Sequence, residues 1–512
     1  MHKYFLTIDN GGTNTKVVIF DEVGKQIAVS AFPTKGLQPH SGFHEINLNK
    51  LWQDLQVAIK DVLQKAQLQG EDISGIATVG HGKGLYLLDK AQQPFTNGIL
   101  SADSRAESQA HQLEENVSQI FEISHQHIMP SQAPVILKWL KEHDSNTYQN
   151  IGSVLSNKDF TGFLLTGEVK QELGDASGNN FVNLTSREYD SRLFDFFGIP
   201  EMISKMPPLI RATDIRGRIT TKVAAETGLK TGTPVYGGMF DIDACAVATG
   251  VLNEERFSVI AGTWNMNIFP SKKMAGIKSG LMNSIFPTDR YLVEASSPTS
   301  AGNLAIILKM LMTAEMRDAH DAHRSIYDNL EAFLKNTDAT FSKVFFFPFL
   351  YGSNADSDAE GTFIGIRSNT TKSELIRAVY EGIVFAHRYH NEALIKVLGK
   401  KPKTIRMSGG ACNSSSWVQM FADILQVPIE IVSATELGGL GGAIASAVGS
   451  GYYQTIEEAV TNMSTVTRQF LPNKQQSKIY DQKYAVYKKL LESLEGSWSF
   501  LRETQELLEK KG

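Results

Sequence analysis

Apolar and polar positions at the start of the chain follow the spacing first of strands and then of a helix. Residues 4–8 form an apolar run that leads into an acid, Asp9, and a polar turn over residues 10–16 precedes a second apolar run, residues 17–20. Two neighbouring glycines between such runs are typical of a β-hairpin. Residues 48–66 carry leucine or isoleucine at intervals of three and four, which predicts an amphipathic helix.

Strand and helix patterns continue to alternate along the chain. Further helices are predicted at 106–118, 300–311, 373–398 and, on the surface, 475–511, and further strands at 73–79, 85–88, 345–349, 404–407 and 427–432. Residues 257–269 repeat the layout of the opening hairpin, which suggests a duplicated strand-turn-strand unit. At 512 residues the chain exceeds the size at which a single core stops growing, so we expect two domains, residues 1–250 and 251–512.

The polar turn of the opening hairpin carries groups that suit a phosphate. Gly11 and Gly12 allow the backbone to approach a ligand, and the N–H groups after them can surround an anion. Asp9, at the end of the strand, could hold Mg²⁺ through water. A plain surface hairpin is the alternative, and the GxxxxGK[ST] loop is excluded because a strand follows. The side-chain donors in the turn are Thr13, Asn14, Thr15 and Lys16.

Composition narrows the classes of function. The chain is 42% hydrophobic and 21% charged with a net charge of −5 and no basic block, which argues against nucleic acid as a main partner. The only two cysteines, Cys245 and Cys412, lack the spacing of zinc ligands or of a disulfide framework. No apolar run reaches the roughly 18 residues of a membrane span, and no signal peptide precedes the first strand, so we expect a soluble cytoplasmic protein.

Glycine-rich sites recur in a fixed order over nearly the full length, and together they resemble the FGGY family of carbohydrate kinases. The resemblance implies an α/β fold with two ribonuclease-H-like domains of the actin and hexokinase type flanking a nucleotide cleft. It also implies ATP and Mg²⁺ as cofactors, transfer of a phosphoryl group to a sugar hydroxyl, and a homodimer. The matching stretches are residues 9–16, 103–105, 158–160, 165–168, 175–178, 237–241, 262–263, 361–365, 381–382 and 408–413.

Roles follow from the resemblance position by position. Asp241 matches the family's general base, which takes the proton of the attacking hydroxyl; the alternative is a helix N-cap. Asp9 matches the metal-associated carboxylate; the alternative is a buried acid paired with Lys16. For the glycines, close packing of helix on strand is the alternative to nucleotide contact. The nucleotide-binding positions are Gly12, Thr13, Asn14, Lys16, Gly262, Thr263, Gly302, Gly409, Gly410, Ala411 and Ser414.

The sugar pocket departs from the pattern of xylulose kinases, whose Gly-Gln-Met-His-Gly corner reads Gly-His-Gly-Lys-Gly here, at residues 80–84. Lys83 replaces an imidazole, and the corner looks like that of the L-xylulose and 3-keto-L-gulonate kinase branch. Lys83 could pair with a sugar carboxylate; the alternative is a solvated lysine at the rim. Ile242 replaces an amide found in several family members. The substrate-binding positions are His81, Gly82, Lys83, Asp103, Arg105 and Asp241, with Arg105 orienting Asp103 or touching the sugar.

Three other functions remain open at this stage. Within the same class, the acceptor could be another ketose or polyol, namely D-xylulose, ribulose or erythritol. An inactive sugar or nucleotide sensor is disfavoured because Asp9 and Asp241 are both present. A chaperone-like ATPase of the same superfamily would need a peptide-binding domain, and the roughly 60 residues after Gly451 are too few and too charged for one.

Overall fold

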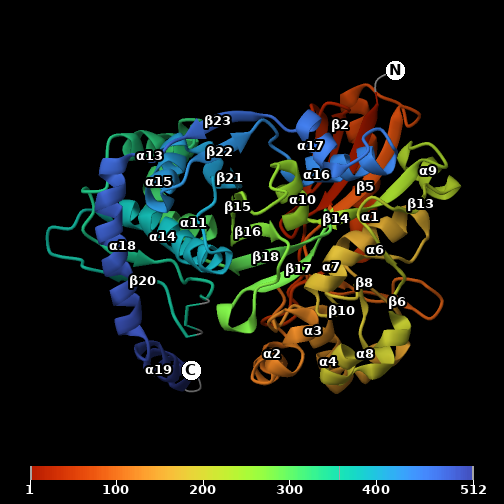
Figure 1. Cartoon of the computed structure of the whole chain (residues 1–512), viewed down its shortest axis with the longest axis horizontal. Coiled ribbons are helices and arrows are strands. Elements are labelled where there is room, and N and C mark those ends of the chain that lie inside the picture. The colour runs from red at the N-terminus through yellow and green to blue at the C-terminus, as the bar shows by residue number, and fades with distance from the viewer. Residues whose placement is uncertain (1–2, 354, 357, 510–512) are drawn as a thin grey trace. The chain divides into compact units, whose positions relative to one another are not determined.

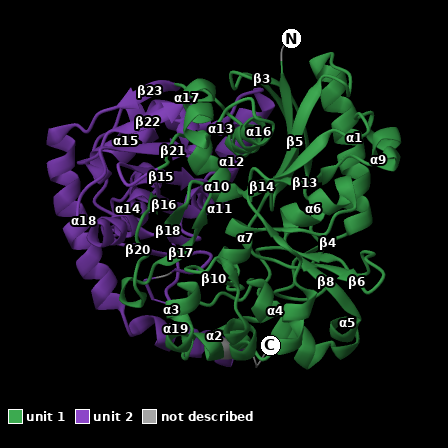
Figure 2. Cartoon of the chain, turned by 45° about the vertical axis from the view of Figure 1, so that its right-hand side comes forward, with its two compact units in different colours: residues 1–252, 270–293, 433–465 green, residues 253–269, 294–432, 466–512 purple. Residues whose placement is uncertain are grey.

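The computed structural model describes residues 3–353, 355–356 and 358–509 (Figure 1). The chain forms two compact units, each made of separate segments (Figure 2). Unit 1 comprises residues 1–252, 270–293 and 433–465, and unit 2 comprises residues 253–269, 294–432 and 466–512. The predicted boundary at 250 lies beside the first division, but two later segments also belong to unit 1. Cys245 and Cys412 are free thiols, and no helix in the described part of the chain is long and apolar enough to cross a bilayer.

The elements of unit 1 are β1 (Tyr4–Asn10), β2 (Asn14–Asp21), β3 (Gln26–Pro33), β4 (Glu45–Ile46), α1 (Leu48–Ala66), β5 (Ile73–Gly80), β6 (Tyr86–Asp89), β7 (Gly98–Ile99), α2 (Glu107–Glu114), η1 (Val117–Gln119), α3 (Phe121–Ser124), α4 (Ala133–His143), α5 (Ser145–Asn150), β8 (Ile151–Leu155), α6 (Asn157–Thr166), β9 (Gln171–Glu172), α7 (Leu173–Gly178), β10 (Val182–Asn183), β11 (Glu188–Tyr189), α8 (Ser191–Phe196), η2 (Pro200–Lys205), β12 (Leu209–Ile210), β13 (Ile215–Arg218), α9 (Thr221–Thr227), β14 (Pro234–Phe240), α10 (Asp241–Ala248), η3 (Ile277–Ser279), β17 (Met282–Phe286), α16 (Leu437–Gly449) and α17 (Ile456–Met463).

The elements of unit 2 are β15 (Arg256–Ala261), α11 (Ala301–Leu311), α12 (Thr313–Asp321), α13 (Ile326–Lys335), β19 (Phe345–Phe347), β20 (Thr362–Ile364), α14 (Lys372–Leu398), β21 (Thr404–Ser408), η4 (Gly410–Asn413), α15 (Ser415–Leu425), β22 (Ile429–Val432), β23 (Val466–Phe470), α18 (Lys474–Leu494) and α19 (Ser497–Glu509). Two strands, β16 (Asn265–Ser271) and β18 (Arg290–Ser297), have residues in both units. The predicted end of the last helix, residue 511, lies outside the described residues.

A six-stranded sheet in the order β13-β14-β5-β1-β2-β3 forms the centre of unit 1. Alternate side chains of a strand point to opposite faces of the sheet, and the side chains of β1 are covered by a helix on each face. Leu6 and Ile8 join a buried apolar cluster with α1, which covers one face. Thr7 and Asp9 face the other side, where the glycines of α16 approach so closely that a Cβ at Gly438 would overlap the Asp9 carboxylate. Helix α16 can therefore lie directly on the sheet and on Asp9.

Unit 2 has a comparable plan. Five neighbouring strands run in the order β16-β15-β21-β22-β23, and β15, β21 and β22 are parallel. The predicted second hairpin is confirmed as β15 and β16, which pair antiparallel across a turn at 262–264. The predicted surface helix after residue 475 is α18, which buries one face against Phe385 of α14 and leaves its other residues at least partly exposed. The buried residues on that face are Tyr480, Tyr484 and Tyr487.

Candidate active site

The carboxyl ends of three parallel strands meet at one edge of the unit 1 sheet. Asn10 of β1 pairs with Gly80 of β5, and Gly80 pairs with Phe240 of β14. Asp9, the corner that starts at Gly80, and Asp241 therefore lie at the same edge. Ligands of open α/β sheets bind outside the carboxyl ends of the strands, so this edge is the candidate site in unit 1.

Asp241 is the first residue of α10, and Phe240 rather than Asp241 occupies the N-cap position. Burial raises the pKa of the Asp241 carboxyl to about 7. The nearby carboxylates of Asp9 and Asp175 contribute to this raised value, while the Ile242 N–H and the Lys83 ammonium oppose it. A carboxyl whose pKa lies near neutrality can accept a proton at working pH, as a general base must.

Asp9 is close enough to Asp241 for the two carboxylates to interact, since the charge of Asp9 contributes to the raised pKa of Asp241. Burial raises the pKa of Asp9 itself to about 6, with Lys16 lowering it and Glu436 raising it. The Lys16 ammonium pairs with Glu436 at 2.6 Å, not with Asp9. Asp9 is therefore an acid that the protein has not neutralised with a direct ion pair among the described residues.

The residues around Asp9 fit a magnesium ion that arrives with a nucleotide. Among the described residues, no group of three or more histidine, cysteine, aspartate or glutamate side chains could hold a metal. Mg²⁺ keeps several waters and is usually bound by one or two carboxylates together with substrate phosphates. A single partly buried carboxylate with a raised pKa meets that description, and a cation would stabilise its charged form.

The turn between β1 and β2 presents three exposed residues, Gly12, Thr13 and Asn14. Bonds on its inner side hold it: the Thr15 hydroxyl donates to Asn10 Oδ1 at 2.8 Å, and the Thr34 hydroxyl donates to the Gly11 carbonyl at 2.9 Å. Thr13 and Asn14 are therefore accessible to a ligand, and their contact with phosphate stays a prediction.

In the corner at residues 80–84, the predicted sugar contact His81 is enclosed by protein, whereas Gly82 and Lys83 line a space. The His81 imidazole is buried, and its Nε2 lies 2.8 Å from Asn157 Nδ2 and 3.3 Å from the Tyr86 hydroxyl. Burial lowers the pKa of His81 to about 4, so the ring is neutral. Its position supports a role in fixing the corner rather than in touching sugar.

Gly82 and Lys83 instead line a narrow space. A Cβ at Gly82 would lie 2.9 Å from the Phe240 ring, so only glycine lets the corner rest on that ring. Lys83 has a left-handed backbone (φ 63°), and its ammonium lies 6.0 Å from the centre of the Phe240 ring. The other residues lining the space are Asp175, Gly178, Asn179 and Phe240.

Asp103 and Arg105 form a closed ion pair. Asp103 is buried and accepts from the His44 N–H and from Arg105, whose Nη2 lies 2.9 Å from Asp103 Oδ2 and 2.7 Å from Glu45 Oε1. The guanidinium also lies over the Phe43 ring at 4.0 Å. These contacts support the predicted orienting role of Arg105, and they occupy both oxygens of Asp103.

In unit 2, the turn between β15 and β16 exposes Thr263 and leaves open space beside Gly262. Gly302, near the start of α11, approaches Thr263 so closely that a Cβ would lie 3.0 Å from its methyl group. Gly409 has φ 90°, and a Cβ there would lie 2.6 Å from the Ala261 carbonyl oxygen. Both glycines thus bring chain segments against the turn.

The predicted nucleotide positions after Gly409 follow the same strand-loop-helix. Gly410 has no neighbour within 4 Å of its missing Cβ, so that side of the loop is open, whereas Ala411 is buried. The Ser414 hydroxyl donates to Glu331 and accepts from the Trp417 N–H, which caps α15. Ser414 therefore connects α13 to the start of α15 in unit 2.

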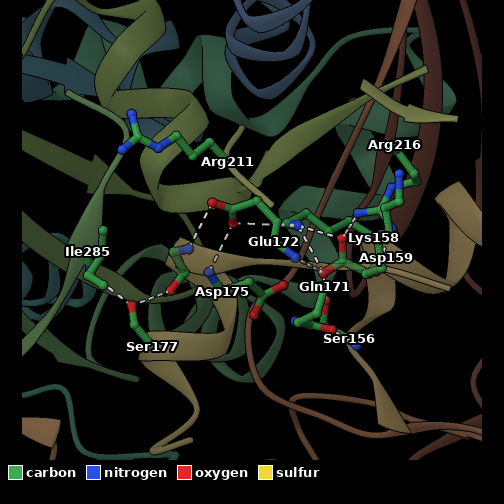
Figure 3. Close-up of polar contacts among 12 residues, drawn as sticks. Ser156, Lys158, Asp159, Gln171, Glu172, Asp175, Ser177, Arg211, Arg216 and Ile285 are labelled. Carbon is green, nitrogen blue, oxygen red and sulfur yellow. Dashed lines mark hydrogen bonds and ion pairs between the residues drawn. The ribbon is translucent and has the colours of Figure 1, made fainter. Parts of the chain in front are cut away.

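A buried charge cluster beneath the unit 1 site was not predicted (Figure 3). Lys158 Nζ lies 3.0 Å from Asp159 and 3.6 Å from Glu172, and Arg216 also pairs with Asp159. Glu172 accepts from the N–H groups of Gly174 and Asp175, and so fixes the start of α7. Charged residues are rarely fully buried, so nothing in the local sequence pattern identified this cluster.

An open glycine turn on a strand-turn-strand in each unit, with partly buried carboxyls at the strand ends of unit 1, is the arrangement expected of a carbohydrate kinase. Models of the FGGY family of carbohydrate kinases match the chain, the N-terminal domain at residues 4–248 and the C-terminal domain at 257–450. The chain belongs to this family and is a sugar kinase.

Individual relatives agree with this assignment. The chain is 32% identical to the L-xylulose/3-keto-L-gulonate kinase of Escherichia coli (98% of this chain, 99% of the relative) and 32% identical to a probable L-xylulose kinase of Pasteurella multocida (96% and 99%). A ligand-bound xylulose kinase from Lactobacillus acidophilus has a similar fold, with a TM-score of 0.88 at 22% identity (98% of this chain, 100% of that chain).

Proposed function

We propose that this sugar kinase transfers the γ-phosphoryl group of MgATP to the terminal hydroxyl of L-xylulose or 3-keto-L-gulonate. The hydroxyl oxygen forms the new bond to phosphorus, the bond from phosphorus to the β–γ bridging oxygen breaks, and the hydroxyl proton passes to Asp241. The pKa of Asp241, raised to about 7, supports this role. Phosphoryl transfer depends mainly on positioning and charge stabilisation, so one base and well-placed donors suffice.

Asp9 would hold Mg²⁺, which neutralises phosphate charge when it is bound. In unit 1 the nucleotide phosphates would contact the exposed turn at residues 12–14, and Lys16 would contribute its charge. In unit 2 the nucleotide contacts would be Gly262, Thr263, Gly302 and the loop 409–414. The use of ATP supports the expected cytoplasmic location. The homodimer implied by the family resemblance stays a prediction.

Lys83 is the observation that favours 3-keto-L-gulonate, which carries a carboxylate, over neutral sugars. It lines the narrow space beside Phe240, and it is near enough to Asp241 to lower the pKa of that carboxyl. An ammonium at this position would attract the carboxylate of a keto-acid, and relatives that are named for L-xylulose or 3-keto-L-gulonate support the same choice.

A screen for ADP release tests the proposal with L-xylulose, 3-keto-L-gulonate, D-xylulose, ribulose and erythritol as acceptors. Lys83→Met is expected to lower kcat/KM for the acid by about 10- to 100-fold, the effect of a lost charge-assisted hydrogen bond, and to change neutral pentuloses much less. Lys90→Met, at an exposed position of unit 1, is the matched control. Equal losses on the acid and the neutral sugars would refute the role of Lys83, and activity on neither L-xylulose nor 3-keto-L-gulonate would refute the proposed substrates.

A further inference from the structure

Asp175 is a buried acid for which the proposed mechanism has no use. It lies on α7 in the stretch 175–178 and lines the same narrow space as Lys83 and Phe240. Its side chain is 1% exposed. Because its charge also contributes to the raised pKa of Asp241, the two carboxyls lie in one neighbourhood of unit 1.

The bonding of the Asp175 carboxyl is incomplete. Asn179 Nδ2 lies 3.1 Å from Oδ1, whereas Oδ2 has no hydrogen-bond partner among the described residues. A buried polar atom without a partner loses its solvation without compensation, at a cost of about 1–3 kcal/mol. An unpaired oxygen on the wall of a narrow space can accept a hydrogen bond from a ligand hydroxyl that enters the space.

A purely structural role does not account for Oδ2. Helix α7 is fixed through backbone groups, because Glu172 accepts from the N–H groups of Gly174 and Asp175 (Figure 3). The Ser177 hydroxyl donates to the Gly174 carbonyl and accepts from the Ile285 N–H at 2.8 Å, which ties the helix to β17. Removing Oδ2 would break none of these bonds, and they hold the carboxyl in place.

We propose that Asp175 is a specificity-determining residue whose Oδ2 hydrogen-bonds to one hydroxyl of the sugar. This inference rests on the sugar site proposed above but not on which sugar occupies it. Lys83 would attract an anionic group of the acceptor, and Asp175 would recognise a neutral hydroxyl. A site built to bond a hydroxyl rejects analogues that lack it, because the buried partner is then left unpaired.

The charges around the two carboxyls define a second, independent readout. Burial raises the pKa of Asp175 to about 7; Lys158 and Ser156 lower it, and Asp159 and Glu172 raise it. Asp241 is influenced by Asp9, Asp175 and Lys83. Removing the charge of Asp175 should therefore lower the pKa of Asp241 and move the acid limb of the kcat/KM profile to lower pH.

The test measures kcat/KM of the wild type, Asp175→Ala and Asp175→Asn on the best acceptor of the panel above, and on analogues of that acceptor that each lack one hydroxyl not phosphorylated. Asp175→Ala is expected to lose about 10- to 100-fold on the complete sugar and less than about threefold on one of the deoxy analogues. The isosteric Asp175→Asn should lose less than Asp175→Ala, and the acid limb should shift in both variants. Asp144→Asn, which removes a carboxylate at the start of α5, is the control and should change neither measurement.

Binding of a fluorescent ATP analogue checks that each variant is folded. Equal losses on every analogue, or a loss below threefold on the complete sugar, would overturn the role of Asp175. If Asp175→Ala fails to fold, Asp175→Asn decides alone, because an amide keeps the size and shape of the carboxyl and removes its charge. A best acceptor other than L-xylulose or 3-keto-L-gulonate would reject the proposed substrates and leave this test intact.

Discussion

Replacing Arg216 by methionine is expected to destabilise the protein by about 3–5 kcal/mol, the usual cost of removing one partner of a buried ion pair. Arg216 and Asp159 have no exposed side-chain surface, so solvent does not screen the charge that remains. The positive charges of Lys158 and Arg216 balance the negative charges of Asp159 and Glu172. The variant would leave one negative charge without compensation. Methionine keeps most of the volume, so the loss reports charge more than packing.

The melting temperature measures this loss. For domains of 150–250 residues, each kcal/mol shifts Tm by about 2–4 °C, and unit 1 has more than 250 residues, so the lower value applies. A fall of about 6–10 °C is therefore expected by calorimetry or circular dichroism. Arg218→Met is the matched control; Arg218 is exposed and donates to the Gly232 carbonyl, so its change should stay within about 0.5 kcal/mol.

The reasoning fails if Arg216→Met lowers Tm by less than about 2 °C or no more than Arg218→Met does. A double variant separates charge from packing. Adding Asp159→Asn to Arg216→Met removes the uncompensated carboxylate, so the two changes together should cost less than the sum of their separate costs. Strictly additive losses would show that the ion pair is not the cause.

Two further predictions concern the proposed site. Because a general base must be deprotonated, kcat/KM should fall about tenfold per pH unit below an apparent pKa near 7, the value to which burial raises the pKa of Asp241. Asp241→Asn should lower kcat/KM about 100- to 10,000-fold. A flat profile between pH 5 and 7 would contradict the role of Asp241. Gly409→Ala should raise KM for ATP at least about tenfold and lower Tm, because the new Cβ would overlap the Ala261 carbonyl and residue 409 has a left-handed backbone. Gly410→Ala should leave Tm unchanged, because no atom lies within 4 Å of the new Cβ. Equal Tm values for the two variants would refute the packing argument.

Regular patterns in the sequence predicted the elements that bear the site. The helix expected at 48–66 is α1, with the same bounds, because its apolar positions keep a strict helical spacing. Both hairpins were predicted for a similar reason, since their glycine turns separate clear apolar runs. Strand β8 was missed because it is short, contains Gly152, and is stabilised by pairing with β6 rather than by its own pattern.

The arrangement of charges could not be predicted in the same way. Lys158, Glu172 and Arg216 are far apart in sequence, and only the folding of α6, β9 and β13 brings them together. Asp175 was included in a family stretch, but its free oxygen depends on which neighbours the fold supplies. The buried state of His81 likewise follows from Tyr86 and Asn157, which lie outside the corner.

The segmented construction of unit 1 affects how this chain can be made. The chain passes from one unit to the other after residues 252, 269, 293, 432 and 465. A ribosome must therefore release nearly the whole polypeptide before α16 can cover the sheet built from the first 250 residues. Until then, the nascent sheet would present Val18, Phe20 and Val79 to chaperones, and a gene truncated after residue 252 would encode an aggregation-prone fragment instead of an independent sugar-binding domain.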